Sequence, residues 1–260
     1  MARLTDLSWW QRFKKIRSTL IAGFLDATDY VDAYALASPW MHFMNFAFST
    51  GSATIGTPND AALGAAFGIM ITNQVYMIAG LTDTNGDPTK PFDGFKTFVN
   101  DHEYFKSVEI GLTTSADRII FDNVHLTFWH KDEQVELKTK KGWGLAGSAS
   151  RYINDNFMPF LRGGYSEDGG TLLQKSVSVG IGYQTQAVPG LFGAAINWGQ
   201  PNEDTFGPNL KNQHALEIFY RITVLNKIAI TADTQLIMDP ALNPDQSTIW
   251  MFNLRARIVV

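Results

Sequence analysis

The sequence predicts an all-β fold, an antiparallel up-and-down β-barrel that crosses a membrane with its strands. The first observation is a strict alternation of apolar and polar residues, a period of two that indicates strands with two different faces. The last residues, "STIWMFNLRARIVV" at 247–260, show this alternation most clearly. The other two observations are turn residues at regular spacing and connections whose lengths alternate along the chain.

A strand with one apolar and one polar face fits two kinds of surroundings. In a soluble sandwich the polar face is the outer one, whereas in a membrane barrel the apolar face meets lipid and the polar face lines water. In the last strand Arg255 and Arg257 alternate with Trp250, Phe252 and Leu254. Taken alone, this strand leaves both architectures open.

Segments with this alternation recur along the chain, with turn residues about every 10 to 20 positions, a spacing typical of all-β proteins. About twelve strands are visible, most of about 10 to 12 residues, which suits a tilted crossing of a bilayer better than the 5 or 6 common in soluble proteins. The predicted strands are 18–27, 63–72, 75–84, 105–115, 123–133, 142–153, 157–168, 175–185, 190–201, 213–223, 227–240 and 247–260.

The connections between these strands alternate between long and short. An up-and-down barrel in an outer membrane has short turns at its periplasmic rim and long loops at its external rim. The pattern therefore favours such a barrel over a soluble sandwich, and it places the C-terminus at the short-turn rim. The long connections include 28–62, 85–104 and 202–212; the short ones are 73–74, 154–156, 186–189 and 224–226, with 116–122 the one poor fit.

Composition limits the function without deciding it. The 260 residues are 45% hydrophobic and 18% charged, with a net charge of −4, which gives no sign of a nucleic-acid partner. The short run Lys138, Lys140 and Lys141 is interpreted as a solvated loop. The absence of cysteine excludes disulfides and thiolate chemistry. No stretch is long and apolar enough for a membrane helix.

Motifs for catalysis or cofactor binding are weak. Asp83, Asn85 and Asp87 superficially resemble a calcium loop, but Pro88 stands where that loop requires glycine, so we interpret the stretch as a turn. The histidines have no metal-ligand spacing. Neither a Gly-x-Ser-x-Gly nucleophile elbow nor a phosphate-binding glycine loop occurs. We therefore expect no cofactor, no metal and no enzymatic activity.

Several stretches carry a family resemblance. They are "STLIAGFLDATDYVDAY" (18–34), "FMNFAFS" (43–49), "YMIAGLTDTNGD" (76–87), "FLRGGYSEDGG" (160–170), "HALEIFYRITV" (214–224) and "ITADTQLIMDPALNP" (230–244). Together they resemble the carbohydrate-selective porins of the OprB type over nearly the whole chain. The last stretch is the most specific, because a near-terminal strand in that family reads close to Thr-Pro-Asp-x-Gln followed by an Asn-Pro turn. Ala232 and Asp239 depart mildly from that pattern.

The resemblance implies a channel of the bacterial outer membrane, made with a signal peptide and a barrel of roughly sixteen strands. The start "MARLTDLSWWQRFKKIRSTL" does not read as a secretory signal. We therefore expect residues 1–260 to form one porin β-barrel domain that is the C-terminal part of a longer porin. Val260 also departs from the aromatic residue in which many such barrels end.

The expected function is passive diffusion of mono- and disaccharides through a water-filled barrel. The expected partners are small neutral sugars, outer-membrane lipid and, through the C-terminal strand, the barrel-assembly machinery; a homo-oligomer is left open. The alternatives are a general outer-membrane porin, a barrel-type enzyme and, less favoured, a soluble ligand-binding β-barrel. The enzyme would need a Ser/His pair on the lipid-facing side near one rim, and strand parity shows none.

Strand parity also predicts which residues face the pore, since these lie opposite the apolar faces. Both signs of charge occur among them, and such a mixture suits the hydroxyls of a neutral sugar, whereas a ring of one sign would select ions. The alternative role for the charged residues is to pair across strands and stiffen the wall. The predicted lumen residues are Glu109, His125, Thr127, Trp129, Arg162, Glu217, Arg221, Asp233, Gln235, Asn253, Arg255 and Arg257.

The segment 28–62 is too long and too aromatic for a plain solvated loop, and long loops in compact proteins are usually functional. We expect it to fold into the barrel and narrow it, with an external cap as the alternative. Trp129, Phe160 and Phe219 are expected to stack on sugar rings or, equally, to pack against such an inward loop. The aromatic residues of the segment are Tyr30, Tyr34, Trp40, Phe43, Phe46 and Phe48.

Overall fold

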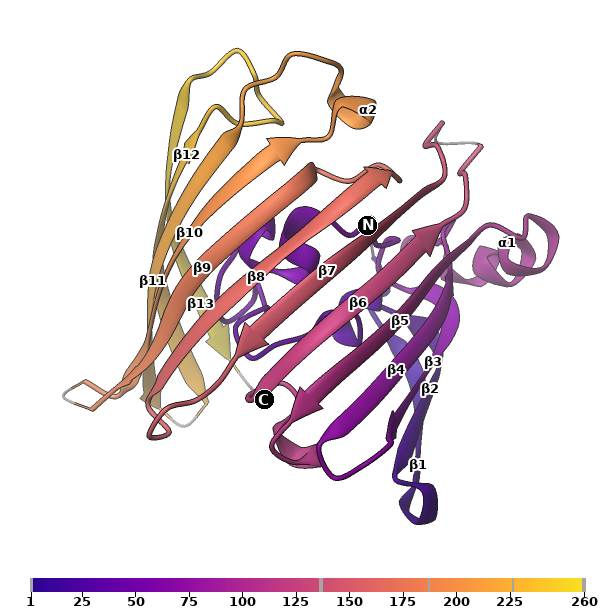
Figure 1. Ribbon diagram of the computed structural model, residues 1–260, viewed down its shortest axis with the longest axis horizontal. Helices are drawn as coiled ribbons and strands as arrows, with labels where there is room; N and C mark the ends of the chain where they lie inside the picture. Colours follow the sequence, from indigo (N-terminus) through magenta and orange to yellow (C-terminus); the bar gives the residue numbers. More distant parts are fainter. Residues whose placement is uncertain (1, 136–137, 187, 226, 259–260) are drawn as a thin grey trace.

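The chain folds into one antiparallel sheet in which each strand pairs with the next along the sequence, from β1 to β13 (Figure 1). This computed structural model describes residues 2–135, 138–186, 188–225 and 227–258. The strands are β1 (Leu7–Phe13), β2 (Ser18–Leu25), β3 (Ala62–Met70), β4 (Val75–Asp83), β5 (Tyr104–Thr113), β6 (Asn123–Lys131), β7 (Gly142–Ser150), β8 (Phe157–Asp168), β9 (Leu173–Thr185), β10 (Gly190–Pro201), β11 (Gln213–Leu225), β12 (Ile228–Met238) and β13 (Thr248–Ile258).

Helices are few and short. The α-helices are α1 (Gly94–Asn100) and α2 (Glu203–Phe206), and the 3₁₀ turns are η1 (Lys14–Ile16), η2 (Ala27–Asp29), η3 (Phe46–Phe48), η4 (Thr50–Ala53), η5 (Pro91–Asp93) and η6 (Ala116–Arg118). Within the described ranges, none of the helices is long and apolar enough to cross a membrane.

The predicted all-β, up-and-down antiparallel fold is confirmed, and each of the twelve predicted strands has a counterpart within a few residues. The sheet has thirteen strands because β1 precedes the first predicted one. Among the described residues β1 and β13 are the two edges of the sheet, and no ladder joins them. The predicted turns 186–189 and 224–226 and the end of the strand 247–260 include positions 187, 226 and 259–260, which lie outside the described residues.

The sheet exposes its apolar side chains and buries its polar ones, the reverse of the distribution in a soluble protein. On β5 the apolar side chains of Val108, Ile110 and Leu112 are 47 to 56% exposed, whereas Ser107 and Glu109, which alternate with them, are buried. The same alternation of exposed apolar and buried polar residues runs along β6. A soluble monomer rarely exposes contiguous apolar surface of this extent. The outer face of the sheet therefore suits lipid, as a transmembrane barrel requires.

The connections differ in length between the two rims. One rim carries the short turns 14–17, 71–74 and 151–156, and the other carries the long connections 26–61, 84–103 and 202–212. Two connections fit less well, 114–122 on the short-turn rim and 169–172 on the long-loop rim. Each element thus crosses from one rim to the other, as in an up-and-down barrel wall.

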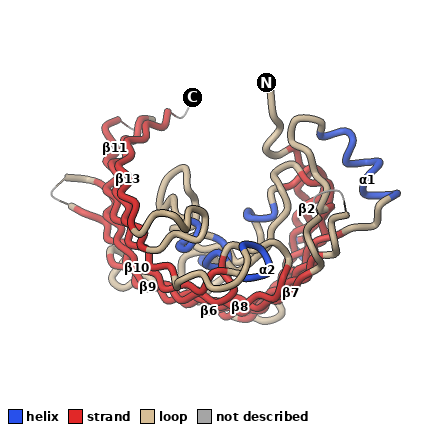
Figure 2. The backbone as a smooth tube through the Cα atoms, turned by 90° about the horizontal axis from the view of Figure 1, so that it is seen from above, coloured by secondary structure: helices blue, strands red, loops and turns tan. Residues whose placement is uncertain are grey.

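The connection between β2 and β3, residues 26–61, lies in the hollow of the curved sheet; we call it the inner segment (Figure 2). It packs on the concave face and forms the core with it. Phe43 packs against Phe48 and against Phe219 of β11, with ring centroids 5.3 and 4.9 Å apart. Tyr34 packs in the same way against Phe160 of β8 at 5.3 Å. The buried core of this molecule therefore lies between the inner segment and the concave, polar face of the sheet.

Candidate functional site

The register of the sheet places the predicted lumen residues on one face, the concave one. Glu109 of β5 lies opposite Thr127 of β6, and Glu217 of β11 lies opposite Gln235 of β12. Directly opposed residues of an antiparallel pair project from the same side of a sheet. Most of these side chains contact the inner segment rather than an open space, and the contacts fall into three groups.

The first group surrounds Asp32 of the inner segment, which is buried. Its carboxylate accepts a hydrogen bond from His125 Nε2 at 2.7 Å and pairs with the Arg162 guanidinium. Burial by itself would raise the pKa of Asp32, but the charge of Arg162 and the hydrogen bond from His125 hold it below its usual range. A buried carboxylate is tolerated only when it is paired and hydrogen-bonded in this way.

Arg162 has no free donor directed to solvent, since its side chain is 1% exposed. Its Nη2 donates to the backbone oxygens of Asp32 and Ser49, both at 3.1 Å, and its Nη1 donates to Ser148 Oγ at 2.9 Å. The guanidinium also lies 3.9 Å from the ring centroid of Tyr34, a cation–π contact. Arg162 is thus committed to holding two parts of the inner segment against β7 and β8.

Glu109 of β5 also holds the inner segment at Asp32. Its Oε2 accepts from the backbone N–H of Asp32 at 2.9 Å and from Thr127 Oγ1 at 2.8 Å. Its Oε1 accepts from the Tyr76 hydroxyl at 2.9 Å. Three donors at these distances satisfy a carboxylate that is 3% exposed.

The second group surrounds Glu217, which is completely buried. Its two oxygens accept the backbone N–H groups of Met44 and Asn45 at 2.6 and 2.8 Å. Asn45 also donates to Gln235 Oε1 at 3.3 Å. Asp233 accepts from Gln235 Nε2 at 3.2 Å and from Asn253 Nδ2 at 3.0 Å. These residues anchor the middle of the inner segment to β11, β12 and β13.

The aromatic residues expected to stack on sugars are also occupied. Trp129 is fully buried and stacks on Phe105 at 6.2 Å, while Phe160 and Phe219 pack on Tyr34 and Phe43. In this arrangement no face of these three rings is free for a sugar. They pack against the inner segment, the alternative that the sequence left open.

The third group contains the predicted residues that stay accessible, Arg221, Arg255 and Arg257. With Trp40 and Lys227 they line a cavity of about 200 Å³ on the concave side of β11, β12 and β13, which we call the cationic cavity. Arg255 Nη2 donates to the backbone oxygen of His42 at 2.8 Å, and Arg221 Nη1 lies 3.0 Å from His42 Nε2.

Burial and the charges of the three arginines lower the pKa of His42 to about 3. The imidazole is therefore neutral at physiological pH, and its Nε2 accepts the hydrogen bond from Arg221. His42 adds no further positive charge to the cationic cavity, whose arginines it partly holds in place.

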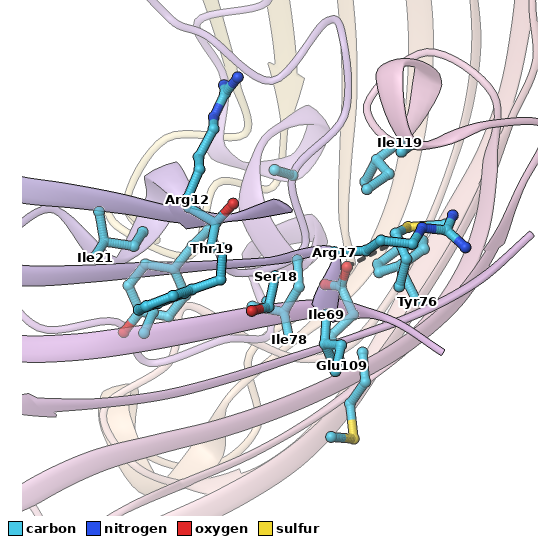
Figure 3. Close-up of a pocket in the computed structure, with 18 of the residues that line it drawn as sticks. Arg12, Arg17, Ser18, Thr19, Ile21, Ile69, Tyr76, Ile78, Glu109 and Ile119 are labelled. Carbon is cyan, nitrogen blue, oxygen red and sulfur yellow. Dashed lines mark hydrogen bonds between the residues drawn. The ribbon is translucent and has the colours of Figure 1, made fainter. Parts of the chain in front are cut away.

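A second, larger cavity of about 460 Å³ lies on the concave side of β1 to β5 (Figure 3). Its walls combine both charges, hydroxyls and aromatic rings, and we call it the mixed cavity. Figure 3 shows side chains of neighbouring strands around one hollow, with Ile119 entering from a separate loop. The polar and aromatic residues that line the mixed cavity include Trp10, Arg12, Arg17, Ser18, Thr19, Asp29, Tyr30, Tyr76, Glu109 and Asp117, of which Tyr76 and Glu109 are at most 3% exposed.

Sequence parity missed several residues of these groups. Asp32 and Asn45 lie on the inner segment and Arg12 on the unpredicted β1, so none had a strand assignment from which to infer a face. The available signal was the resemblance itself, since Asp32 lies within the stretch 18–34.

Comparison with known proteins gives a consistent result. The model of a family described as carbohydrate-selective porin, OprB family, matches residues 176–259. A solved structure described as the high-pH structure of Pseudomonas putida OprB is similar to this chain with a TM-score of 0.72 and 14% sequence identity. The match covers 98% of this chain and 73% of that one. A search of curated proteins gave no match. The family model therefore confirms the resemblance inferred from the sequence over residues 176–259, and the solved structure confirms the fold over nearly the whole chain.

Proposed function

We propose that this chain, with OprB-family sequence at residues 176–259 and the fold of an OprB porin throughout, is an outer-membrane, carbohydrate-selective porin. It forms the wall of a water-filled β-barrel through which mono- and disaccharides diffuse down their gradients. It works in the bacterial outer membrane, with its apolar face in contact with lipid.

The observation that carries this proposal is the reversed distribution of side chains. Large apolar residues are exposed on the outer face of the sheet, and charged residues lie on the concave face. Water-filled membrane barrels have this distribution, because their outer strand faces meet hydrocarbon and their inner faces meet solvent. A soluble β-barrel with a ligand in its mouth would have the opposite one.

The inner segment gives the channel its narrow part. It lies in the hollow of the sheet (Figure 2). Asp29, Tyr30 and Ala33 of this segment line the mixed cavity, and Trp40 and Met41 line the cationic cavity. In this proposal, two sets of concave residues have different roles. The set that holds the inner segment in place is Glu109, Trp129, Arg162, Glu217, Asp233, Gln235 and Asn253. The set that lines the solute path is Arg221, Arg255 and Arg257. Selection by size then follows from the fixed position of the segment.

We assign the chain a transport role and no catalytic step. A barrel-type enzyme would need a serine and a histidine in contact near a rim, and among the described residues no serine hydroxyl hydrogen-bonds to a histidine. Asp32 and His125 do form a pair, but both are buried beneath the inner segment. They serve its anchoring.

Two further partners follow from the outer face. Trp250, Phe252 and Leu254 of the last strand are 57 to 78% exposed, so β13 offers a long apolar edge. We propose that the barrel-assembly machinery and membrane lipid contact this strand during insertion. A homo-oligomer packed through the outer face is an additional proposal.

A liposome-swelling series tests the function directly. The purified chain is reconstituted into liposomes and exposed to neutral sugars of increasing size. We expect swelling with monosaccharides, slower swelling with disaccharides and little with larger oligosaccharides, because the inner segment limits the cross-section. Protein-free liposomes provide the control. Swelling rates equal to those of the control for every sugar would contradict the proposal.

A further inference from the structure

The inner segment covers the negative charges of the concave face more completely than the positive ones. This difference indicates which class of sugar the channel favours. The carboxylates of Asp32, Glu109, Glu217 and Asp233 are all at most 5% exposed. Each accepts hydrogen bonds from neighbouring groups, as described above. They are therefore removed from contact with solutes, even though they lie on the face that lines the channel.

The cations near β13 are covered less completely. Arg255 donates to the backbone oxygens of Pro39 and His42 and is 16% exposed, whereas Arg257 and Lys227 are exposed. Register places Arg221 and Arg255 on either side of Thr231 in one row across β11, β12 and β13, and Arg257 opposite Ala229 in the next row. Lys227 joins them on the wall of the cationic cavity, and none of the described residues that line it carries a carboxylate. The nearest one, Asp233, lies 4.0 Å from Arg255, is buried and accepts hydrogen bonds from Gln235 and Asn253.

The other lining groups of the cationic cavity suit a sugar. Trp40 is 78% exposed and offers a ring face on which a sugar ring can stack. The hydroxyls of Thr223 and Thr231 also line the cavity. Its volume of about 200 Å³ is of the order of one monosaccharide rather than a longer chain.

We propose that the cationic cavity is a binding site for monosaccharides that carry an anionic group, a carboxylate or a phosphate. Guanidinium groups bind such oxyanions through two parallel charge-assisted hydrogen bonds, which are stronger than hydrogen bonds to the uncharged hydroxyls of a neutral sugar. Several positive charges on a partly enclosed wall also raise the local concentration of anions. Sugar acids or sugar phosphates should therefore pass faster than neutral sugars of equal size.

This inference rests on the proposed porin function, and one experiment separates the two. Liposomes containing the full chain are tested with glucose, glucuronate and glucose 6-phosphate. We expect glucose to pass and at least one of the two anionic sugars to pass several-fold faster. The two anions distinguish carboxylate from phosphate recognition. Equal or slower passage of both anions, with glucose still passing, would overturn the inference and leave the porin function standing.

Variants show whether the cationic cavity is responsible. The double variant Arg257→Gln and Lys227→Gln removes two of its charges, neither of which pairs with a carboxylate among the described residues. Arg12→Gln is the matched control, since it removes a concave positive charge from the mixed cavity. We expect the ratio of anionic-sugar to glucose passage to fall several-fold in the double variant and to stay at the wild-type value in the control. An unchanged preference for anionic sugars in the double variant would contradict the proposal that the cationic cavity binds them.

Binding in detergent provides a readout that does not depend on transport. Titration of the solubilised chain with glucuronate or glucose 6-phosphate should show saturable binding that is weakened several-fold in the double variant and unchanged in Arg12→Gln. Glucose should bind more weakly than either anion. Equal binding of all three sugars would contradict the proposal even if the channel were inactive in liposomes.

Discussion

Arg162 and Arg257 lie on the same concave face, yet they are in opposite situations. Arg162 is buried beneath the inner segment, where it pairs with Asp32 and stacks on Tyr34. Arg257 is exposed on the wall of the cationic cavity, where its Nη1 donates to the Met41 sulfur at 2.6 Å. A residue on the face that lines the channel is therefore not necessarily in contact with solutes. The position of the inner segment decides which charges a solute meets.

The largest effect should come from Arg162→Ala. This change leaves Asp32 buried without its guanidinium, and breaking a buried ion pair in this way costs about 3–5 kcal/mol. The measurement is the free energy of unfolding of the detergent-solubilised protein in a denaturant titration. Arg257→Ala is the matched control and should cost less than about 1 kcal/mol, as exposed charges generally do. Equal losses of unfolding free energy in the two variants would contradict the different roles assigned to Arg162 and Arg257.

Glu217→Ala should have the next largest effect. It removes the acceptor of two backbone N–H groups, those of Met44 and Asn45, and each buried donor left unsatisfied costs about 1–3 kcal/mol. We expect lower stability together with a larger single-channel conductance, because the inner segment is released from β11. Glu217→Gln keeps one acceptor oxygen and should lie between Glu217→Ala and the wild type. A conductance unchanged in both variants would show that this anchor does not hold the narrow part.

Arg257→Gln should leave stability almost unaltered but change ion selectivity. Loss of an exposed positive charge from the channel wall lowers the local concentration of anions. The reversal potential across a planar bilayer in a salt gradient should therefore shift toward cation preference. Lys141→Gln, on the long-loop rim, serves as a control for loss of charge away from the concave face. A shift of equal size in that control would remove the special role of the cationic cavity.

The smallest effect concerns Asp29 in the mixed cavity. Asp29 is exposed to solvent, but partial desolvation by the groups around it, with further contributions from the charges of Asp26 and Asp6, raises its pKa to about 6 from the ordinary 3.8. The folded state thus favours the protonated carboxyl, so the stabilisation from this group is complete below the ordinary pKa and is lost as the pH rises through about 6. Asp29→Asn should remove this part of the pH dependence of unfolding. Identical pH profiles for variant and wild type would contradict it.

The sequence predicted the strands well because each carries its own signal. Alternation within β5 or β6 is complete over the whole strand, and it gives both the element and its outward face. The strand β1 lacked this signal, since Trp9 and Trp10 are adjacent, as are Gln11 and Arg12. Its existence depends on pairing with β2 rather than on a local pattern.

The use of each lumen residue could not be predicted in the same way. Parity placed Arg162, Glu217 and Trp129 on the concave face, but their burial is caused by the inner segment. Its contacts with Arg162 and Glu217 join residues 130 and 173 positions apart in sequence, which no local pattern reports. The interspersed charges therefore indicated a channel of mixed polarity. The structure leaves its carboxylates covered on the β11 to β13 side and its arginines accessible.

The accessibility of single labelled positions in a lipid bilayer tests directly whether this sheet is a channel wall. The chain has no cysteine, so a spin label can be attached to one introduced cysteine at a time. We predict that labels at Val124, Leu126 and Phe128 on the outer face collide with oxygen dissolved in lipid and are protected from a water-soluble nickel chelate. Labels at Thr223 and Arg257 on the concave face should show the reverse. Labels at the three outer positions that are as accessible to the nickel chelate as the concave ones would contradict the assignment of this sheet as a channel wall.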